Sequence, residues 1–208
     1  MRWLVDAGHG GMYNGRYTTA PQKMYRYPDG LVIYEGLINR AIAFRLCAKL
    51  TNAHLPFEQI NDNEQDTPLD VRVGRANEAY DKDSSAVFLS IHSNLGGQAG
   101  FEIFTSKGET KSDKIAQVFC DTYQQSFPNM KFRSDTLDGD EDKESNFYVL
   151  HRTKSPALLV ENLFIDNRFE AEFLLSESGQ EQIAECLLQS IKKVESTVLN
   201  SRRWIRLS

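Results

Sequence analysis

The chain has 208 residues, of which 40% are hydrophobic and 25% are charged, a balance typical of a folded globular protein rather than a disordered one. At this length a single domain can bury a core without disulfides or oligomerisation. The formal net charge is −5, so the chain lacks the excess of Lys and Arg with which proteins neutralise nucleic-acid phosphates. We therefore exclude nucleic acid as a partner and expect a single-domain monomer.

The two ends of the chain lead to further expectations. Residues 3–6 already form a strand pattern, which leaves no room for the apolar stretch and cleavage site of a signal peptide. No later apolar run is long enough to span a bilayer. We expect synthesis in the cytoplasm, unless the sequence begins at a domain whose leader was removed. The domain should cover residues 1–196. Residues 197–208 form a tail too short to fold alone, whose arginines either touch an anionic surface or fray: Arg202, Arg203 and Arg206.

Short apolar runs alternate with segments of helical periodicity along the whole chain. This alternation predicts an α/β fold, in which a sheet is covered by helices on both faces. Some runs are apolar throughout, as is typical of strands buried on both faces. From their length and bounding turn residues, the predicted strands are residues 3–6, 57–60, 87–92, 101–105, 147–150 and 158–163.

Four helices are predicted between and after these strands. The first begins just after Glu35, because apolar residues recur at three- and four-residue steps while Asn39, Arg40 and Lys49 face away. A second runs to about residue 80, with Thr67 as its cap. A third covers residues 112–127, and the last begins near residue 178 in capping-box order. Burial as small hydrophobic side chains is favoured over metal ligation for the three cysteines: Cys47, Cys120 and Cys186.

Two segments are irregular. The acidic run at residues 138–144 predicts a solvated loop, since carboxylates this crowded repel each other unless calcium or a basic partner is present. The segment between His9 and Glu35 is too long for a simple turn, and long loops tend to carry function. It is rich in tyrosines: Tyr13, Tyr17, Tyr25, Tyr27 and Tyr34.

Four side chains suited to metal binding or proton transfer lie where strands end or a helix begins: His9, Glu35, His92 and Glu161. Each alone is a weak signal, because a histidine after a strand is often structural and a glutamate at a helix start usually complements the helix dipole. The glycines around His9 let the backbone bend sharply and leave the imidazole open to a ligand. In an open α/β sheet, ligands bind beyond the carboxyl ends of the strands, where His9 and His92 meet if their strands are parallel.

Two imidazoles and one carboxylate form a three-ligand set that zinc accepts, and the fourth tetrahedral position then stays free for water. We predict that His9, Glu35 and His92 hold Zn²⁺. A separate carboxylate must still carry the proton to the departing amine. Glu161 suits this role, because an unpaired charge inside the apolar run at residues 158–163 requires a partner.

At these residues the sequence resembles the zinc-dependent N-acetylmuramoyl-L-alanine amidases, a family of bacterial and phage wall lytic enzymes. The resemblance spans nearly the whole chain, and several blocks in the right order are far more specific than any one motif. The blocks are Asp-Ala-Gly-His-Gly-Gly at residues 6–11, Glu35 followed by Asn39, residues 69–77 with Arg72, Arg75, Ala76 and Asn77, residues 88–94, residues 100–104, and residues 156–167 with Glu161.

The resemblance implies a phosphorylase/hydrolase-like fold with a mixed, mostly parallel sheet of about six strands. It also implies that His9, Glu35 and His92 bind zinc, that Glu161 is the catalytic acid/base, and that the enzyme hydrolyses the amide between the lactyl group of N-acetylmuramic acid and L-alanine. The substrate is then peptidoglycan, and the enzyme acts on the cell wall, in the periplasm or outside the cell. The expected substrate-binding residues are Asn94, His151, Tyr25 and Tyr27.

The sequence also departs from the family pattern. Members commonly have an arginine at the position that His151 occupies, so His151 is either structural, substrate-facing or an assisting residue near the reaction centre. The loop between His9 and Glu35 is longer than usual, and its tyrosines either form a groove wall that stacks on sugar or peptide, or pack the loop onto the domain. No extra helical insertion lies between His92 and Glu161, so we expect an open site.

Two rival functions stay open at this stage. A zinc peptidase or deacetylase acting on cell wall needs the same ligand set and the same catalytic glutamate. If the chain were a binding module that merely recognises cell wall, we would expect at least one of the four candidate metal-binding and catalytic residues to be lost. All four are present.

Overall fold

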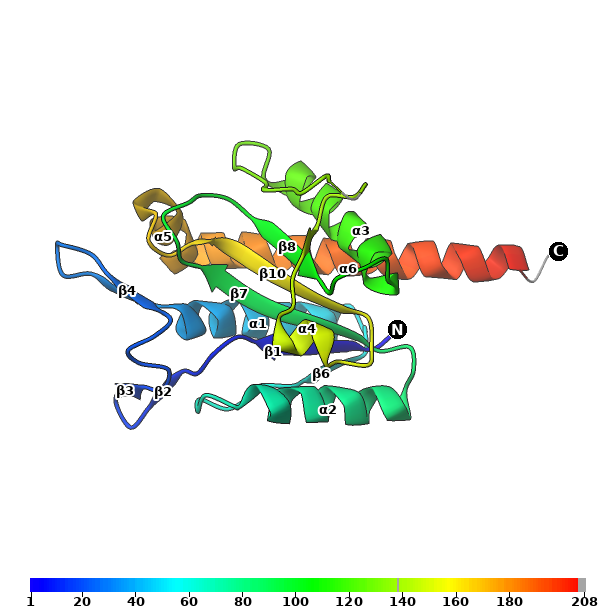
Figure 1. Cartoon of the computed structure of the whole chain (residues 1–208), viewed down its shortest axis with the longest axis horizontal. Helices are drawn as coiled ribbons and strands as arrows, with labels where there is room; N and C mark the ends of the chain where they lie inside the picture. The colour runs from blue at the N-terminus through cyan, green and yellow to red at the C-terminus, as the bar shows by residue number, and fades with distance from the viewer. Residues whose placement is uncertain (138, 206–208) are drawn as a thin grey trace.

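The computed structural model describes residues 1–137 and 139–205, with side chains described as far as Thr197. A six-stranded sheet with helices on both faces forms the body of the molecule (Figure 1). The strand order is β6-β1-β7-β10-β8-β9, and only the β10–β8 pair is antiparallel within it. The predicted α/β class and the mostly parallel sheet are therefore confirmed. The strands are β1 (Trp3–Ala7), β6 (Phe57–Gln59), β7 (Val87–Asn94), β8 (Glu102–Thr105), β9 (Lys143–Glu144) and β10 (Ala157–Phe164).

The helices divide between the two faces of the sheet. Four of them contribute to one large core, and the other two cover the smaller core on the opposite face. The first group comprises α1 (Glu35–Asn52), α3 (Lys111–Ser126), α5 (Arg168–Leu175) and α6 (Glu177–Ile205), and the second comprises α2 (Leu69–Lys82) and α4 (Tyr148–His151). Among the described residues, no helix combines the length and the apolar character needed to cross a membrane.

The alternation of side chains along β7 determines which face carries the site. Leu89 and Ile91 point into the large core, whereas Phe88 belongs to the small core with Leu4 and Leu159. Because successive side chains of a strand point to opposite faces, His92 lies on the same face as Phe88. The site therefore lies on the face covered by α2 and α4, at the carboxyl ends of the parallel strands.

The prediction of a strand at residues 147–150 is wrong. This segment forms the short helix α4, in which the Leu150 and His151 amides both donate to the carbonyl of Phe147, at 3.0 and 2.9 Å. Val149 and Leu150 are buried in the small core. Four apolar residues are too few to distinguish a buried strand from one buried helical turn, so the periodicity carried no information here.

The acidic run at residues 138–144 is not wholly solvated, which corrects a second prediction. Lys143–Glu144 forms the edge strand β9, paired with β8. Asp142 is only 1% exposed and accepts a 2.7 Å hydrogen bond from the Thr105 hydroxyl. Burial and the nearby Asp140 raise the pKa of Asp142 to about 7, although the bond from Thr105 acts against this. Asp138 lies outside the described residues.

Details of the helix ends also differ from the predictions. Thr67 does not cap α2, because its hydroxyl donates to the Asn61 side chain at 2.9 Å. Glu181 forms no capping box in α6 and instead contacts the Lys49 ammonium at 2.6 Å. The α6 helix continues without a break past residue 196, and α5 precedes it where no helix was predicted. Arg206 and the side chains of Arg202 and Arg203 lie outside the described residues. All three cysteines are buried, as predicted.

The long segment between β1 and α1 folds into two small hairpins. One pairs β2 (Met12–Tyr13) with β3 (Arg16–Tyr17), and the other pairs β4 (Met24–Arg26) with β5 (Val32–Tyr34). Tyr27 is buried beyond β4, and its hydroxyl donates to the carbonyl of Ile165 at 3.0 Å. Tyr27 therefore packs the loop onto the domain instead of facing a groove.

Candidate functional site

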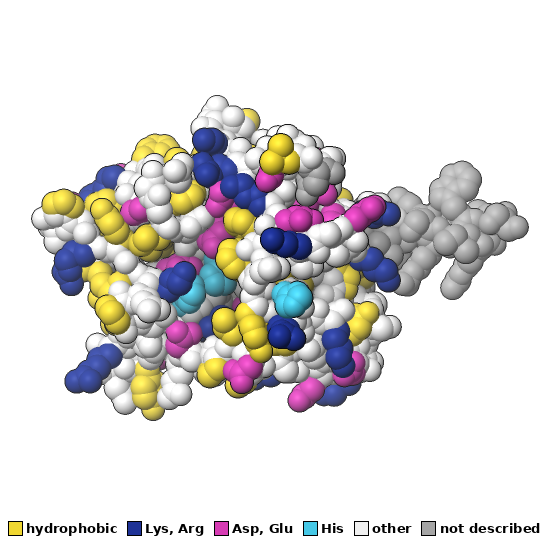
Figure 2. Space-filling model, viewed as in Figure 1, with side chains coloured by type: hydrophobic (Ala, Val, Ile, Leu, Met, Phe, Trp, Pro, Cys, Tyr) yellow, Lys and Arg dark blue, Asp and Glu magenta, His cyan; other side chains and the backbone are white. Residues whose placement is uncertain are grey.

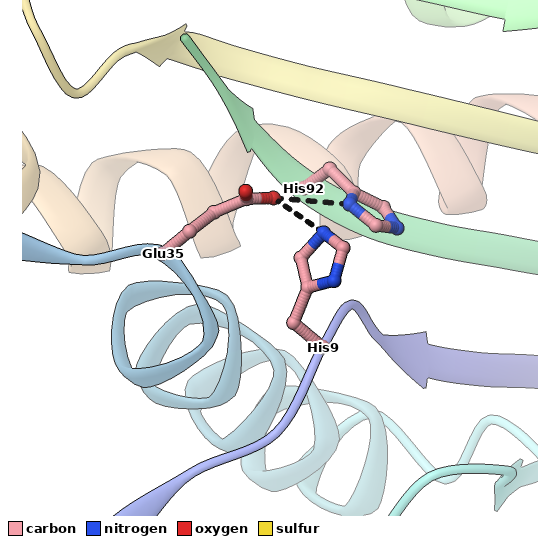
Figure 3. A group of neighbouring side chains, drawn as sticks. All are labelled: His9, Glu35 and His92. Atoms are coloured by element: carbon pink, nitrogen blue, oxygen red, sulfur yellow. Dashed lines mark hydrogen bonds and ion pairs between the residues drawn. The ribbon is translucent and has the colours of Figure 1, made fainter. Parts of the chain in front are cut away.

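The three predicted metal ligands come together at the carboxyl end of the sheet. His9 follows β1, Glu35 is the first residue of α1, and His92 lies near the end of β7. Glu35 Oε1 lies 3.1 Å from His9 Nε2 and 3.1 Å from His92 Nδ1, so one carboxylate oxygen faces both imidazoles (Figure 3). Residues distant in sequence therefore form one compact donor group.

The spacing of these atoms fits a divalent cation. The candidate ligand atoms all lie within 4.8 Å of one another. Two atoms bound at ~2.0 Å to a tetrahedral zinc ion lie about 3.3 Å apart, close to the two contacts of Glu35. His9 Nε2 is buried and, among the described residues, makes only the 3.1 Å contact with Glu35. A nitrogen left in this state is suited to a metal ion.

An unusual backbone conformation directs His9 toward the site. The φ angle of His9 is 65°, in the left-handed region that costs a non-glycine residue on the order of 1–3 kcal/mol. Two side chains hold its carbonyl: Arg40 Nη1 donates at 2.6 Å and Asn61 Nδ2 at 3.1 Å. The sharp bend that was expected from the flanking glycines is thus made by the histidine itself.

Gly8 makes room for the imidazole of His92. A Cβ atom at Gly8 would lie 2.3 Å from Cε1 of His92 and 2.5 Å from each ring nitrogen. Because carbon atoms in contact are normally about 3.5–4.0 Å apart, no larger residue fits there without displacing the ring. Gly8 is therefore required by close packing in the site.

Two polar residues orient Glu35. Asn39, one helical turn later, donates to Glu35 Oε1 at 3.3 Å and to the carbonyl of Gly8 at 3.2 Å. The amide of Ser93 donates to the same carboxylate oxygen at 3.4 Å, and its hydroxyl donates to Asn39 Oδ1 at 3.2 Å. Asn39 is fully buried, so the prediction that it faces away from the core is wrong.

A buried ion network beside Ser90, two residues before His92, was also not predicted from the sequence. The Asp6 carboxylate, fully buried on β1, accepts a 2.6 Å hydrogen bond from the Ser90 hydroxyl. Arg72 from α2 lies 3.6 Å from Asp6 and donates to Asp66 at 2.9 Å. Such a network ties α2 and its preceding loop to the strands that end at the metal ligands.

Burial and neighbouring charges shift the pKa values of the three candidate ligands. Burial lowers the pKa of His9, and its contact with Glu35 only partly offsets this. Burial opposes ionisation of Glu35, but the two histidines outweigh it and hold the pKa of this carboxyl well below its ordinary range. Burial also acts to lower the pKa of His92, whereas Glu35 and Glu161 raise it overall. Glu35 is thus ionised, as a metal ligand must be.

Glu161 lies beside His92 on the neighbouring strand β10. The two residues are direct partners across the β10–β7 pair, so their side chains share one face. Oε2 of Glu161 is buried without a hydrogen-bond partner among the described residues. Burial, with a contribution from Glu35, raises the pKa of Glu161 to about 7, although His92 acts in the opposite direction. The structure therefore brings Glu161 next to the metal-binding group.

The strand β10 has a bulge directly after Glu161, and hydrogen bonds hold the next residue, Asn162, in place. The register of β10 against β7 shifts between Glu161 and Phe164, and Leu163 adopts a left-handed φ of 63°. Asn162 donates to the carbonyl of His92 at 3.0 Å and accepts from the Tyr123 hydroxyl at 2.8 Å. Bulges of this kind redirect side chains beside functional sites.

The predicted substrate-binding residues do not form one group. The Asn94 amide donates to Glu102 at 2.6 Å, and its oxygen accepts from the Leu95 amide at 2.8 Å. Tyr25 is half-buried and packs edge-on against Tyr27, which is buried, so of the two alternatives left open for the loop tyrosines Tyr27 follows the one that packs the loop onto the domain. His151 is exposed at the end of α4 and, within the described residues, has no hydrogen bond or ion pair with the metal ligands.

The site opens onto one face of the molecule. Figure 2 shows a recess with histidine and acidic side chains at its floor and Lys and Arg side chains at its rim. The helices between His92 and Glu161, α3 and α4, pack into the two cores and not across the metal ligands. Within this recess the side chains of His9 and His92 are 16% and 12% exposed, whereas Glu35 is buried behind them.

Comparisons with known proteins agree with this geometry. Two curated relatives are CwlM, an N-acetylmuramoyl-L-alanine amidase of Bacillus licheniformis, and an endolysin of Bacillus phage SPP1. They are 30% and 28% identical over 87% and 92% of this chain, which covers 63% and 65% of their own lengths, less than two thirds. The crystal structure of an N-acetylmuramoyl-L-alanine amidase from Clostridium difficile 630 has a TM-score of 0.73 at 25% identity and covers 94% of this chain and 96% of its own. A family model described as N-acetylmuramoyl-L-alanine amidase matches residues 4–193, and the chain therefore belongs to this family.

Proposed function

We propose that this chain is a zinc-dependent N-acetylmuramoyl-L-alanine amidase, which hydrolyses the amide between the lactyl group of N-acetylmuramic acid and L-alanine in peptidoglycan. The observation that supports it most is the convergence of His9, Glu35 and His92 beside Glu161. Two imidazoles and a carboxylate are a ligand set typical of catalytic zinc. Its place of action is then the cell wall, in the periplasm or outside the cell.

The chemistry divides between the metal and Glu161. A bound zinc ion would supply a Lewis acid that polarises the scissile carbonyl and lowers the pKa of water. Glu161 accepts a proton from the attacking water and delivers it to the alanine nitrogen as the C–N bond breaks. A carboxyl with a pKa of about 7 suits both steps, since general acid/base catalysis works best when the pKa lies near the working pH.

The bond cleaved is tested by product analysis. Purified sacculi are digested with the zinc-loaded chain, and the new termini are identified. The amidase releases free N-terminal alanine and leaves intact muramic lactate. A peptidase or deacetylase uses the same ligand set but produces cuts inside the stem peptide or free acetate, and either product in place of alanine termini would overturn the proposal.

The role of Glu161 is tested by Glu161→Ala. This variant should bind zinc like the parent chain while losing wall lysis by a factor of about 10²–10⁴, the usual contribution of a general acid/base. Glu109→Ala, which changes an exposed glutamate, is the matched control and should leave lysis unchanged. Undiminished lysis by Glu161→Ala removes this residue from the mechanism. Wall binding without lysis by the parent chain would instead identify a binding module.

A further inference from the structure

A buried carboxylate next to Glu161, that of Glu102, is ion-paired with two cationic side chains. Glu102 on β8 is the direct cross-strand partner of Glu161, so its side chain lies on the same face of the sheet. Its Oε1 accepts from Arg133 Nε at 2.7 Å and from Lys143 Nζ at 2.6 Å. Asn94 donates to the other oxygen at 2.6 Å. None of these contacts involves a candidate metal ligand, although the charge of Glu102 contributes to the raised pKa of Glu161.

The cluster carries a net positive charge. Burial opposes ionisation of Glu102, but the bonds from Lys143 and Arg133 outweigh it and keep its pKa below the ordinary value, so it is ionised. One carboxylate faces two cations, which leaves one positive charge on a chain whose overall net charge is −5. One carboxylate thus holds both cations in place, and Glu170 also interacts with Arg133 through its charge.

The two cations also have donors to spare. Glu102 is 5% exposed, whereas the side chains of Arg133 and Lys143 are 21% and 24% exposed. Among the described residues, Arg133 uses two of its five N–H donors, on Glu102 and Gln98, and Lys143 uses one of three. Arg133 lies over the Phe164 ring and Lys143 over the Phe104 ring, which fixes their positions further. Free donors on an ordered cation pair are suited to a carboxylate ligand.

The position of the pair relative to Glu161 indicates which part of the substrate reaches it. Glu161 delivers its proton to the alanine nitrogen, so that nitrogen lies beside Glu161 and the stem peptide extends from there. His92, Glu161 and Glu102 follow one another across adjacent strands about 4.8 Å apart, on one face. The row that starts at the metal ligand His92 and passes Glu161 continues toward β8 and β9, and this is the direction that we assign to the peptide. An extended peptide advances ~3.3 Å per residue, so its second or third residue meets the cations.

We propose that Arg133 and Lys143, held by Glu102, bind a carboxylate on the second or third residue of the stem peptide and thereby select stems in which this group is free over stems in which it is amidated. This inference rests on the proposed amidase function. It assigns the carbonyl side of the scissile bond, with the sugar, to the His9 end of the site and the peptide to the β8–β9 end.

The test uses two synthetic N-acetylmuramoyl tripeptides that differ only in whether the carboxyl groups of the second and third residues are free or amidated. Release of free N-terminal alanine by the zinc-loaded full chain gives kcat/KM for each. We expect the parent chain to prefer the free form by about tenfold or more, as a charge-assisted hydrogen bond allows. Lys143→Met and Arg133→Gln should each bring this ratio close to one, mainly by lowering kcat/KM for the substrate whose carboxyl groups are free.

Because the ratio is taken within one variant, a partial loss of folded protein cancels. Lys154→Met is the matched control, since Lys154 is ion-paired with Asp81 at 2.7 Å and, among the described residues, has no hydrogen bond or ion pair with Glu102, and it should retain the preference. Equal rates of the parent chain on both substrates, or a preserved preference in Lys143→Met and Arg133→Gln, would overturn the inference. If the two variants lose kcat/KM equally on both substrates, the cluster has a purely structural role and the inference is overturned as well. If the parent chain releases alanine from neither substrate, the proposed function itself fails.

Discussion

Replacing Gly8 by alanine should remove metal binding without unfolding the protein. The new Cβ would lie 2.3 Å from Cε1 of His92, where contacting carbons are normally about 3.5–4.0 Å apart. The imidazole must therefore move by roughly 1 Å, whereas zinc–ligand distances tolerate only about ±0.2 Å. Gly8 does not have a positive φ, so the collision alone is responsible and the backbone is not strained. Since changes that merely disturb ligand orientation already cost 10–100-fold in metal affinity, we expect a loss of at least about 100-fold.

The measurement is a zinc competition with a coloured chelator, combined with urea unfolding of the metal-free protein. The matched control is Gly74→Ala in α2, where an added Cβ meets no atom within 4 Å. This control should bind zinc normally. Its free energy of unfolding should rise by about 0.5–1 kcal/mol, because alanine is more favourable than glycine inside a helix. A folded Gly8→Ala protein that binds zinc as tightly as the parent chain would refute the geometry given for His92.

Three further changes test other parts of the structure. Asn39→Ala removes a hydrogen bond to Glu35 and should lower zinc affinity about tenfold in the chelator competition; unchanged affinity would show that Asn39 does not orient the ligand. Tyr123→Phe leaves the buried oxygen of Asn162 without its donor and should lower the free energy of unfolding by about 1–3 kcal/mol, measured in urea, with zinc affinity unaltered. The pKa of Asp142 is raised from 3.8 to about 7, chiefly by burial, so between these values the folded chain holds a proton that the unfolded chain has lost, and stability falls as the pH rises. Asp142→Asn should remove this part of the slope in urea titrations from pH 4 to 8, and an identical slope in the variant would contradict the assignment.

Sequence patterns predicted the four chemical residues because each stands at a boundary that the chain itself marks. His9 and His92 follow apolar runs, Glu35 precedes a periodic segment, and Glu161 comes directly after the apolar run at residues 157–160. Parallel pairing of β1, β7 and β10 then brings three of them to one edge of the sheet. Local patterns and one general rule about α/β sheets pointed to these residues, and the resemblance to the amidase family made the signal specific.

The residues that support the site were harder to predict, because their burial depends on partners distant in the sequence. Asn39 is polar on a helix and was assigned to the solvent side, yet it is buried against Glu35 and Gly8. In α5 the usual pattern is reversed, since Phe169 is 72% exposed while Glu170 is buried. The Glu170 carboxylate accepts from the amides of Gly100 and Phe164, which no local pattern reveals.

The edge strand was missed for a related reason. Lys143–Glu144 has no apolar residue and lies in an acidic run, so only its pairing with β8 makes it a strand. The same pairing places Lys143 against Glu102. The part of the chain that looked least structured in sequence thus contributes directly to the surroundings of Glu161.

The order of the four residues along the chain separates two tasks that an enzyme must combine. Among the described residues, the group that could hold a metal ion comes from positions up to 92, whereas Glu161, the proposed proton carrier, lies almost seventy positions later, on β10. Glu161 meets the metal-binding group across the ladder between β7 and β10, where it pairs directly with His92. Under the proposed mechanism, substitutions on β10 that displace Glu161 and leave His92 in place should therefore form a distinct class, which still binds the ion but does not hydrolyse the wall.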